Sequence, residues 1–466
     1  MYNILASSLL LAVLSSLICP QALFAEMTPD TSRSKFWFGS YGRVGLSTDE
    51  KGAQGRRWQI TPFAPRLIED NYIELDLGAQ PYQGPTAKVT TVLTLSFFDQ
   101  LFHYDGQASA TIALRRAYVE AENLFGGKSF VSLGSRWLRG NDIYLLNFWP
   151  LDDLNTLGLT WGMRTQRSEA FLHVGVSRTD PSRQAQRISV PSARFFGAEE
   201  VLFLDRQRGI FAGLYERRYG GEAGKLGWKW KLYAELHTLP SGERALEGSF
   251  TETESLPDDL GLLAGFQLGA WSLRHDQDHI NLWFRYARGL AIYDELGSPA
   301  AFDQKLRSWD AEELRLALAG NHVLGRLSVQ WGGYVRAYED ADRVTLDFDD
   351  RVEGSMVVRP QLRFGHFTPA VEASAQLSQA MGMNPQTQGQ GLAEIYQFAL
   401  LPALTFGDPA TLGSFSRPQL RLIYAVTLMN DAARTRYSVS DPLAPEALEH
   451  YVGARAEWWF GRGGGY

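Results

Sequence analysis

Apolar and polar residues alternate in short stretches along most of the chain. Between Leu226 and Leu236 every even-numbered residue is apolar, whereas Lys229, Lys231 and Glu235 occupy odd-numbered positions. Because successive side chains of a β-strand point to opposite faces, this pattern predicts a strand with one apolar and one charged face. The same alternation recurs in the stretches 36–44, 71–78, 415–426 and 451–460.

Two all-β architectures alternate in this way: a soluble sandwich and a closed barrel in a membrane. The apolar face here carries Trp, Tyr and Phe near the ends of the segments, as do the aromatic girdles of membrane barrels. The opposite face carries Arg, Lys, Asp or Glu in nearly every segment, which suits a water-filled lumen. We therefore expect a closed antiparallel transmembrane β-barrel, since an open sheet edge could not be satisfied in hydrocarbon.

Long polar connections separate the alternating stretches and themselves alternate with short turns. The long ones are 46–62, 99–112, 238–260, 294–308, 338–352, 377–394 and 430–449. Dividing residues 26–466 by about 24 residues per strand and connection gives about 18 strands, although 16 or 20 would fit almost as well. No repeat or linker is evident, so we expect 26–466 to form one barrel domain.

Composition and charge narrow the function further. The chain has 45 Lys and Arg against 52 Asp and Glu, and it lacks a basic run, which argues against nucleic acid as a partner. Residues 1–25 contain no charged side chain and hold an apolar stretch from Ile4 to Ile18, so we expect a signal peptide cleaved after Ala25. The only cysteine, Cys19, lies in that leader. We expect no disulfide, metal site or cofactor in the rest.

Several blocks of sequence resemble the maltoporin-like (LamB-type) carbohydrate porins. They are Phe-Gly-Ser-Tyr-Gly-Arg-Val-Gly at 38–45, the stretch 65–78, Leu-Arg-Arg-Ala-Tyr-Val at 114–119, the stretch 134–149, the run 415–418 and Gly-Ala-Arg-Ala-Glu-Trp-Trp-Phe at 453–460. The block 134–149 is similar to the inward-folded third loop of that family. The resemblance implies an 18-stranded barrel, a homotrimer in the bacterial outer membrane and passive uptake of oligosaccharides of the maltose or maltodextrin type.

The resemblance also implies an aromatic slide, on which the apolar face of a sugar ring stacks. The matching positions are Tyr41, Tyr72, Phe415 and Trp459, and Phe415 stands where other members commonly have Trp. Trp283 is added because it alternates with Asn281 and Arg285 on the polar face. Phe102 or Tyr104 is the candidate for a slide residue supplied by a neighbouring subunit. The alternative for each aromatic is a ring that merely fills interior space.

The resemblance also implies a track of polar residues beside these aromatics, which binds sugar hydroxyls. Its residues are Arg43, Arg66, Glu74 and Arg115, with Asp142, Asn147 and Trp149 on the constriction loop. Charged partners make strong hydrogen bonds, and arginine presents fixed planar donors to neighbouring hydroxyls. Asn147 replaces a frequent Asp, and Trp149 stands where a smaller aromatic would narrow the pore. The alternative is that these charges only hold the loops in place.

Three functions remain open. The first is a sugar-selective channel, and the second is a general diffusion porin without a saturable site. The third is an outer-membrane enzyme embedded in the barrel, for which the eight His residues offer no nucleophile and base grouping. We therefore expect a protein that is not an enzyme, with an oligosaccharide and outer-membrane lipid as partners. Whether a periplasmic sugar-binding protein acts with it is left open.

Overall fold

The computed structural model describes residues 36–461 with short gaps. The gaps are 103–108, 178–183, 193, 195–196, 222–224, 247–250, 293–301, 343–347, 386, 408–411, 439 and 442–443. The expected leader, Tyr104 and the terminal stretch 462–466 lie outside the described residues.

A single antiparallel sheet forms the wall of the barrel, and its strands follow one another in chain order. They are β1 (Phe36–Asp49), β2 (Tyr72–Gln83), β3 (Lys88–Gln100), β4 (Ser109–Asn123), β5 (Ser129–Arg139), β6 (Asp153–Arg164), β7 (Ser168–Ser177), β10 (Arg208–Gly220), β11 (Gly227–Leu239), β14 (Asp259–Trp271), β15 (His279–Gly289), β16 (Glu312–Leu324), β17 (Leu327–Glu339), β18 (Arg351–Leu362), β19 (Ala370–Ala380), β20 (Ala393–Leu401), β21 (Ala403–Thr405), β22 (Gln419–Met429) and β23 (Leu448–Phe460). The segments β20 and β21 flank Pro402 and both pair with β22, so they are two parts of one strand. The described residues therefore form an 18-stranded barrel.

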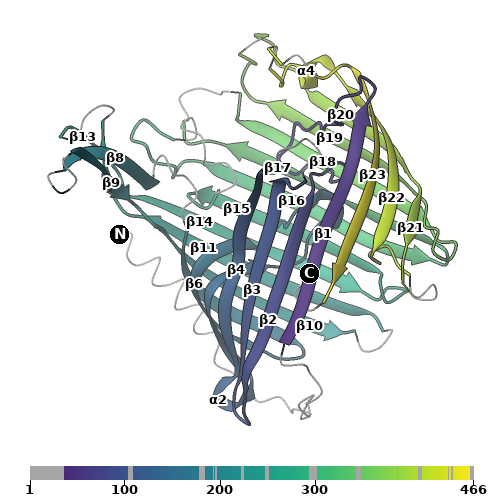
Figure 1. Cartoon of the computed structure of the whole chain (residues 1–466), viewed down its shortest axis with the longest axis horizontal. Helices are drawn as coiled ribbons and strands as arrows, with labels where there is room; N and C mark the ends of the chain where they lie inside the picture. The colour runs from purple at the N-terminus through teal and green to yellow at the C-terminus, as the bar shows by residue number, and fades with distance from the viewer. Residues whose placement is uncertain are drawn as a thin grey trace. The chain divides into compact units, whose positions relative to one another are not determined.

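The first and last strands close the barrel. In Figure 1, β1 (purple) lies beside β23 (yellow), and the two pair from Ser40 with Phe460 to Asp49 with Tyr451. On its other edge β1 pairs with β2, with Tyr41 opposite Glu74. Because every wall strand has a partner on both sides, no strand edge is left open to lipid.

The two faces of the wall carry the chemistry that the alternation predicts. On β11, Lys229, Lys231 and Glu235 are buried on the inner face, whereas Trp228 and Leu232 are about half exposed on the outer face. The rings of Trp228 and Tyr219 on the neighbouring strand stack on the outer face at 4.2 Å, at the end of the strands where the turn is short. This arrangement is an apolar outer surface with an aromatic border, around a polar interior.

The connections at the two ends of the barrel differ in length. Short turns join the strands at one end, at 84–87, 124–128, 165–167, 221–226 and 325–326. Long connections lie at the other end and include two hairpins, β8 (Ala185–Ser192) with β9 (Gly197–Asp205) and β12 (Gly242–Ala245) with β13 (Thr253–Leu256). In the described part of the chain the helical turns are α2 (Leu124–Gly127), η2 (Tyr144–Leu146) and α4 (Asp431–Arg434). None of the described helices is long and apolar enough to cross a membrane.

Candidate functional site

Two connections turn into the barrel and pack on each other. One is the stretch 57–70 between β1 and β2, and the other is the stretch 140–152 between β5 and β6. The backbone N–H of Arg66 donates to the carbonyl of Leu145 at 2.9 Å, and the rings of Phe63 and Phe148 stack at 3.8 Å. The two stretches therefore act as one constriction. The sequence predicted an inward fold only for the second.

The turn at the tip of the second stretch is fixed by its own backbone. The N–H of Ile143 donates to the carbonyl of Phe148 at 2.7 Å, and the turn η2 lies between them. Asn147 ends this turn with φ of 52°, a left-handed conformation that asparagine adopts more readily than most residues. Ile143, Leu145 and Leu146 belong to a buried apolar cluster that includes wall residues, and Asp142 and Asn147 beside them line the passage.

Contacts with the wall hold the constriction in place. Phe63 and Phe148 both pack against Tyr334 of β17, with ring centroids 5.5 and 5.3 Å away. The guanidinium of Arg315 lies about 5 Å from the centres of both phenylalanine rings. Leu67 joins a second apolar cluster with residues of β20, β22 and β23. Aromatic stacking and burial thus act together with hydrogen bonds to Gln376 of β19.

A cavity of about 570 Å³ lies beside the constriction. Six of the sequence-predicted residues line it: Tyr41, Arg66, Asp142, Asn147, Phe415 and Trp459. They come from β1, β23, both inward stretches and the connection 406–418. The structure therefore brings together residues that are far apart in the sequence, whereas their role in binding remains a prediction.

Aromatic rings follow one another along this cavity. The ring of Tyr144 on the constriction stands edge-on to Phe415 at 5.6 Å and to Trp459 at 6.0 Å. The imidazole of His279 lies 6.0 Å beyond Phe415. Tyr41 on β1 packs at 6.0 Å against Tyr72, which does not itself line the cavity. The arrangement offers flat apolar surfaces in series.

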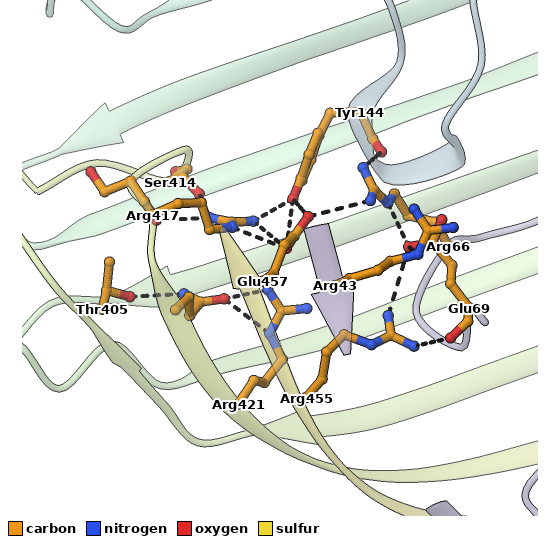
Figure 2. A network of polar contacts seen from close by, with 12 residues as sticks. Arg43, Arg66, Glu69, Tyr144, Thr405, Ser414, Arg417, Arg421, Arg455 and Glu457 are labelled. Atoms are coloured by element: carbon orange, nitrogen blue, oxygen red, sulfur yellow. Dashed lines mark hydrogen bonds and ion pairs between the residues drawn. The ribbon is translucent and has the colours of Figure 1, made fainter. Parts of the chain in front are cut away.

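A network of charged side chains runs beside the rings, and Figure 2 shows it from close by. At its centre, the Glu457 carboxylate accepts the Tyr144 hydroxyl at 3.0 and 3.1 Å. It also pairs with Arg417 at 2.9 Å and with Arg66 at 3.3 Å. The network therefore fixes the hydroxyl end of the same tyrosine whose ring contacts Phe415 and Trp459.

The second carboxylate of the network, Glu69, lies close to three guanidiniums. Arg66 pairs with it at 3.0 Å, and Arg43 and Arg455 lie 3.7 Å away. Arg66 thus bridges Glu69 and Glu457 (Figure 2). Such hydrogen-bonded ion pairs are held rigidly, so the donors that face the cavity are preorganised.

Glu74 and Arg115 form a separate pair beside Tyr72. Arg115 pairs with Glu74 at 2.8 Å and also bonds the Tyr72 hydroxyl. Its guanidinium lies 3.8 Å from the ring centre of Trp137. Neither Glu74 nor Arg115 lines the cavity. They face the interior next to it, together with Tyr72.

Asp142 is a carboxyl group on the lining of the cavity. Burial raises the pKa of Asp142 to about 6, against an opposing attraction from Arg66 and Arg139. Its charge therefore changes near pH 6, whereas an ordinary Asp loses its charge about two pH units lower.

The structure corrects the expectation for Trp283. Its side chain points inward, as the alternation predicts, but it is fully covered within an apolar cluster that includes Leu146 and Leu151 of the constriction. It does not line the cavity, so it offers no surface to a sugar. The alternation gives the face of a strand but says nothing of a loop that covers that face.

Trp149 was expected on the constriction, but its side chain does not face the passage. It is 7 % exposed, it does not line the cavity, and Arg139 lies 4.1 Å from its ring centre. It supports the constriction rather than forming its surface. Phe102 is 39 % exposed at the start of the connection after β3 and lies outside the cavity lining.

Other lining residues were not predicted as site residues from the sequence. They include Tyr144, Arg218, Lys229, Trp271 and His279. Tyr144 lies inside the block 134–149, so an aromatic in that block was the available signal. Trp271 ends its strand on the polar face, where it lies over Gly227 and the alternation could have found it.

These features define an outer-membrane porin, a multi-pass β-barrel of the bacterial outer membrane: a closed barrel, an apolar outer face, a charged interior and inward-folded connections. The sequence model of the LamB porin family matches residues 36–460, and the chain belongs to this family. The resemblance noted from the sequence is thereby confirmed. A comparison with curated proteins finds no match.

Solved structures of other outer-membrane proteins are similar over most of the chain. OpdK of Pseudomonas aeruginosa is 11 % identical, with 92 % of this chain and 99 % of that chain covered and a TM-score of 0.42. OccAB2 of Acinetobacter baumannii is 10 % identical, with 91 and 98 % covered and a TM-score of 0.45. OmpT of Vibrio cholerae is 9 % identical, with 92 and 100 % covered and a TM-score of 0.39.

Proposed function

We propose that this porin is a channel for the facilitated passive diffusion of oligosaccharides, of the maltose or maltodextrin type. The observation that carries the proposal is the series of rings along the cavity. Tyr41, Tyr144, Phe415 and Trp459 come from separate segments and line the same cavity as Arg66. A channel that only sieved small solutes would have no need of aromatic surfaces in this order.

The chemistry of a sugar matches both sides of the passage. The CH face of a pyranose ring stacks on an aromatic plane, and its hydroxyl rim needs donors and acceptors. Arg66 and Asp142 supply charged hydrogen-bonding groups on the lining, and Asn147 supplies an amide. Each such contact is weak enough to release the sugar to the next site, as conduction requires.

The assembly and the partners are part of the proposal. A homotrimer in the lipid of the outer membrane is proposed from membership of the family, with Phe102 as the described candidate for a contribution to a neighbouring subunit. Chemical crosslinking in membranes, with a ladder that ends at three copies, tests the trimer. Hand-over of sugar to a periplasmic sugar-binding protein is compatible with a passive channel. The proposed role involves no enzymatic step.

Block of single-channel current by sugars tests the proposed function. The purified protein is reconstituted in planar bilayers, and ion current is recorded with maltose, maltotriose, maltohexaose or sucrose. The expected result is block that saturates with concentration and strengthens from maltose to maltohexaose, because longer chains contact more rings. Sugar flux without saturable block would instead identify a general diffusion porin.

A further inference from the structure

The charged network beside Trp459 contains more cations than anions. Around the two carboxylates Glu69 and Glu457, the ion pairs of this network bring together five guanidiniums, those of Arg43, Arg66, Arg417, Arg421 and Arg455. The neighbouring Arg57 is attracted mainly to Glu69, which is already counted, and Arg359 is balanced by Glu372 at 2.5 Å. Among the described residues, this wall of the passage therefore carries an excess of positive charge.

The lining of the cavity shows the same imbalance. Its described charged residues are Arg66, Arg218 and Lys229 against the single carboxyl of Asp142. Arg218 and Lys229 share Glu216 with Lys231, and Lys231 pairs with Asp152 at 3.2 Å. This second group therefore has three cations and two anions, again an excess of positive charge. Both walls of the passage thus favour a negative charge between them.

Burial makes the excess effective. The side chains of Arg66, Arg417, Arg421 and Arg455 are each less than one-tenth exposed, and that of Arg43 is 15 % exposed. Charges that are largely removed from water are screened less by solvent and salt than surface charges. Their field reaches into the cavity, where low-dielectric walls concentrate it.

We propose that the passage is anion-selective and that, among oligosaccharides, it prefers chains that carry carboxylates, such as oligomers of a uronic acid. The proposal rests on the proposed function, because the aromatic rings still bind the sugar faces. The planar guanidinium fork is a good match for a carboxylate. Cations on two walls, rather than at one point, suit a chain in which successive sugar rings carry a charge.

Two measurements on the wild-type channel in planar bilayers test this. In a gradient of KCl, the reversal potential should show that chloride is preferred over potassium. The Debye length is about 10 Å in about 0.1 M KCl. In this solution trigalacturonate should block the current at about tenfold lower concentration than the neutral maltotriose, which has the same number of rings. In about 1 M KCl this difference should shrink, because salt screens the charges.

Variants locate the effect. Arg43→Gln and Arg455→Gln, alone and together, should lower the ratio of the two blocking affinities toward one and shift the reversal potential toward potassium. Arg434→Gln is the matched control, because Arg434 pairs with Asp431 on the exposed helix α4. It should leave both quantities unchanged.

The outcomes separate this inference from the proposed function. Equal block by the acidic and neutral trisaccharides, or a preference for potassium, would overturn the charge preference and leave the sugar channel standing. Absence of saturable block by either trisaccharide would overturn both. Stronger acidic block in the wild type that is lost in the arginine variants supports the inference.

Discussion

At the scale of single residues, Tyr144 joins the aromatic and the charged parts of the passage. Its ring contacts Phe415 and Trp459, and its hydroxyl donates to Glu457. The guanidinium of Arg66 lies 4.5 Å from its ring centre. The position of this one side chain therefore sets where the rings stand relative to the cations.

Replacing Tyr144 by Phe should separate these two roles. The ring remains, but the hydrogen bond to a charged carboxylate is lost, and such bonds contribute about 1.5–3 kcal/mol. We expect the free energy of unfolding in lipid vesicles to fall by about 1.5 kcal/mol. Maltohexaose should still block the channel saturably. Unchanged stability in a urea titration would show that the hydroxyl does not anchor the constriction.

The carboxyl of Asp142 should make ion selectivity depend on pH. Because its pKa is raised to about 6, the group is ionised at pH 7.5 and becomes protonated as the pH falls through 6, whereas an ordinary Asp would keep its charge at pH 5. Protonation removes a negative charge from the lining, so the preference for chloride should rise between pH 7.5 and pH 5.

Asp142→Asn is the matched variant for this prediction. It should show the stronger chloride preference at both pH values, since it has no charge to lose. Reversal potentials in a KCl gradient measure the effect. A wild type and a variant that respond equally to pH would contradict the assignment.

The sequence predicts on which face of a strand a side chain lies, but it does not predict whether a loop buries that side chain. Tyr41 and Trp459 lie on the polar faces of the alternating stretches 36–44 and 451–460, and both line the cavity. Trp283 was placed on the same face by the same rule, yet the constriction buries it completely. Whether an inward side chain meets water is decided by tertiary contacts that have no period in the sequence.

At the scale of elements, the strands follow from the sequence and the inward connections do not. Each wall strand sorts its residues between lipid and lumen, so period two marks it directly. The stretch 57–70 has no such period and overlaps the long polar connection 46–62. Its fold depends on Phe63 stacking on Phe148 and on Leu67 packing with residues of β20, β22 and β23.

Charges introduced on the outer face of β11 should be destabilising in proportion to depth. Leu226, in the short turn before the strand, and Leu232, within it, are 58 and 53 % exposed on the same face. Leu232→Arg should lower the free energy of unfolding by about 2–4 kcal/mol, and Leu226→Arg by about 0–1 kcal/mol, because only Leu232 lies deep in the bilayer.

Urea unfolding in lipid vesicles, followed by tryptophan fluorescence, compares the two variants directly. The pair uses the same substitution, so differences in side-chain chemistry cancel. Equal losses of stability would mean that the outer face of β11 does not cross the membrane as described.

At the scale of the whole molecule, closure of the barrel makes the passage. The pairing of β1 with β23 places Tyr41 opposite Trp459, residues from the two ends of the chain. Chain length divided by an average strand unit could not separate 16, 18 and 20 strands. The number follows from the pairing of the strands around the closed sheet, in which β20 and β21 are two parts of one strand interrupted at Pro402.

Sugar block in the Trp459→Ala channel is the most direct test that the aromatic series conducts sugar. Loss of one stacking ring should raise the half-blocking concentration of maltohexaose about tenfold while the open-channel current in KCl stays close to that of the wild type. Trp161 lies on the outer face of β6, and the control channel Trp161→Ala should be blocked by maltohexaose like the wild type. If Trp459→Ala and Trp161→Ala are blocked equally, the rings along the cavity are not the path of the sugar.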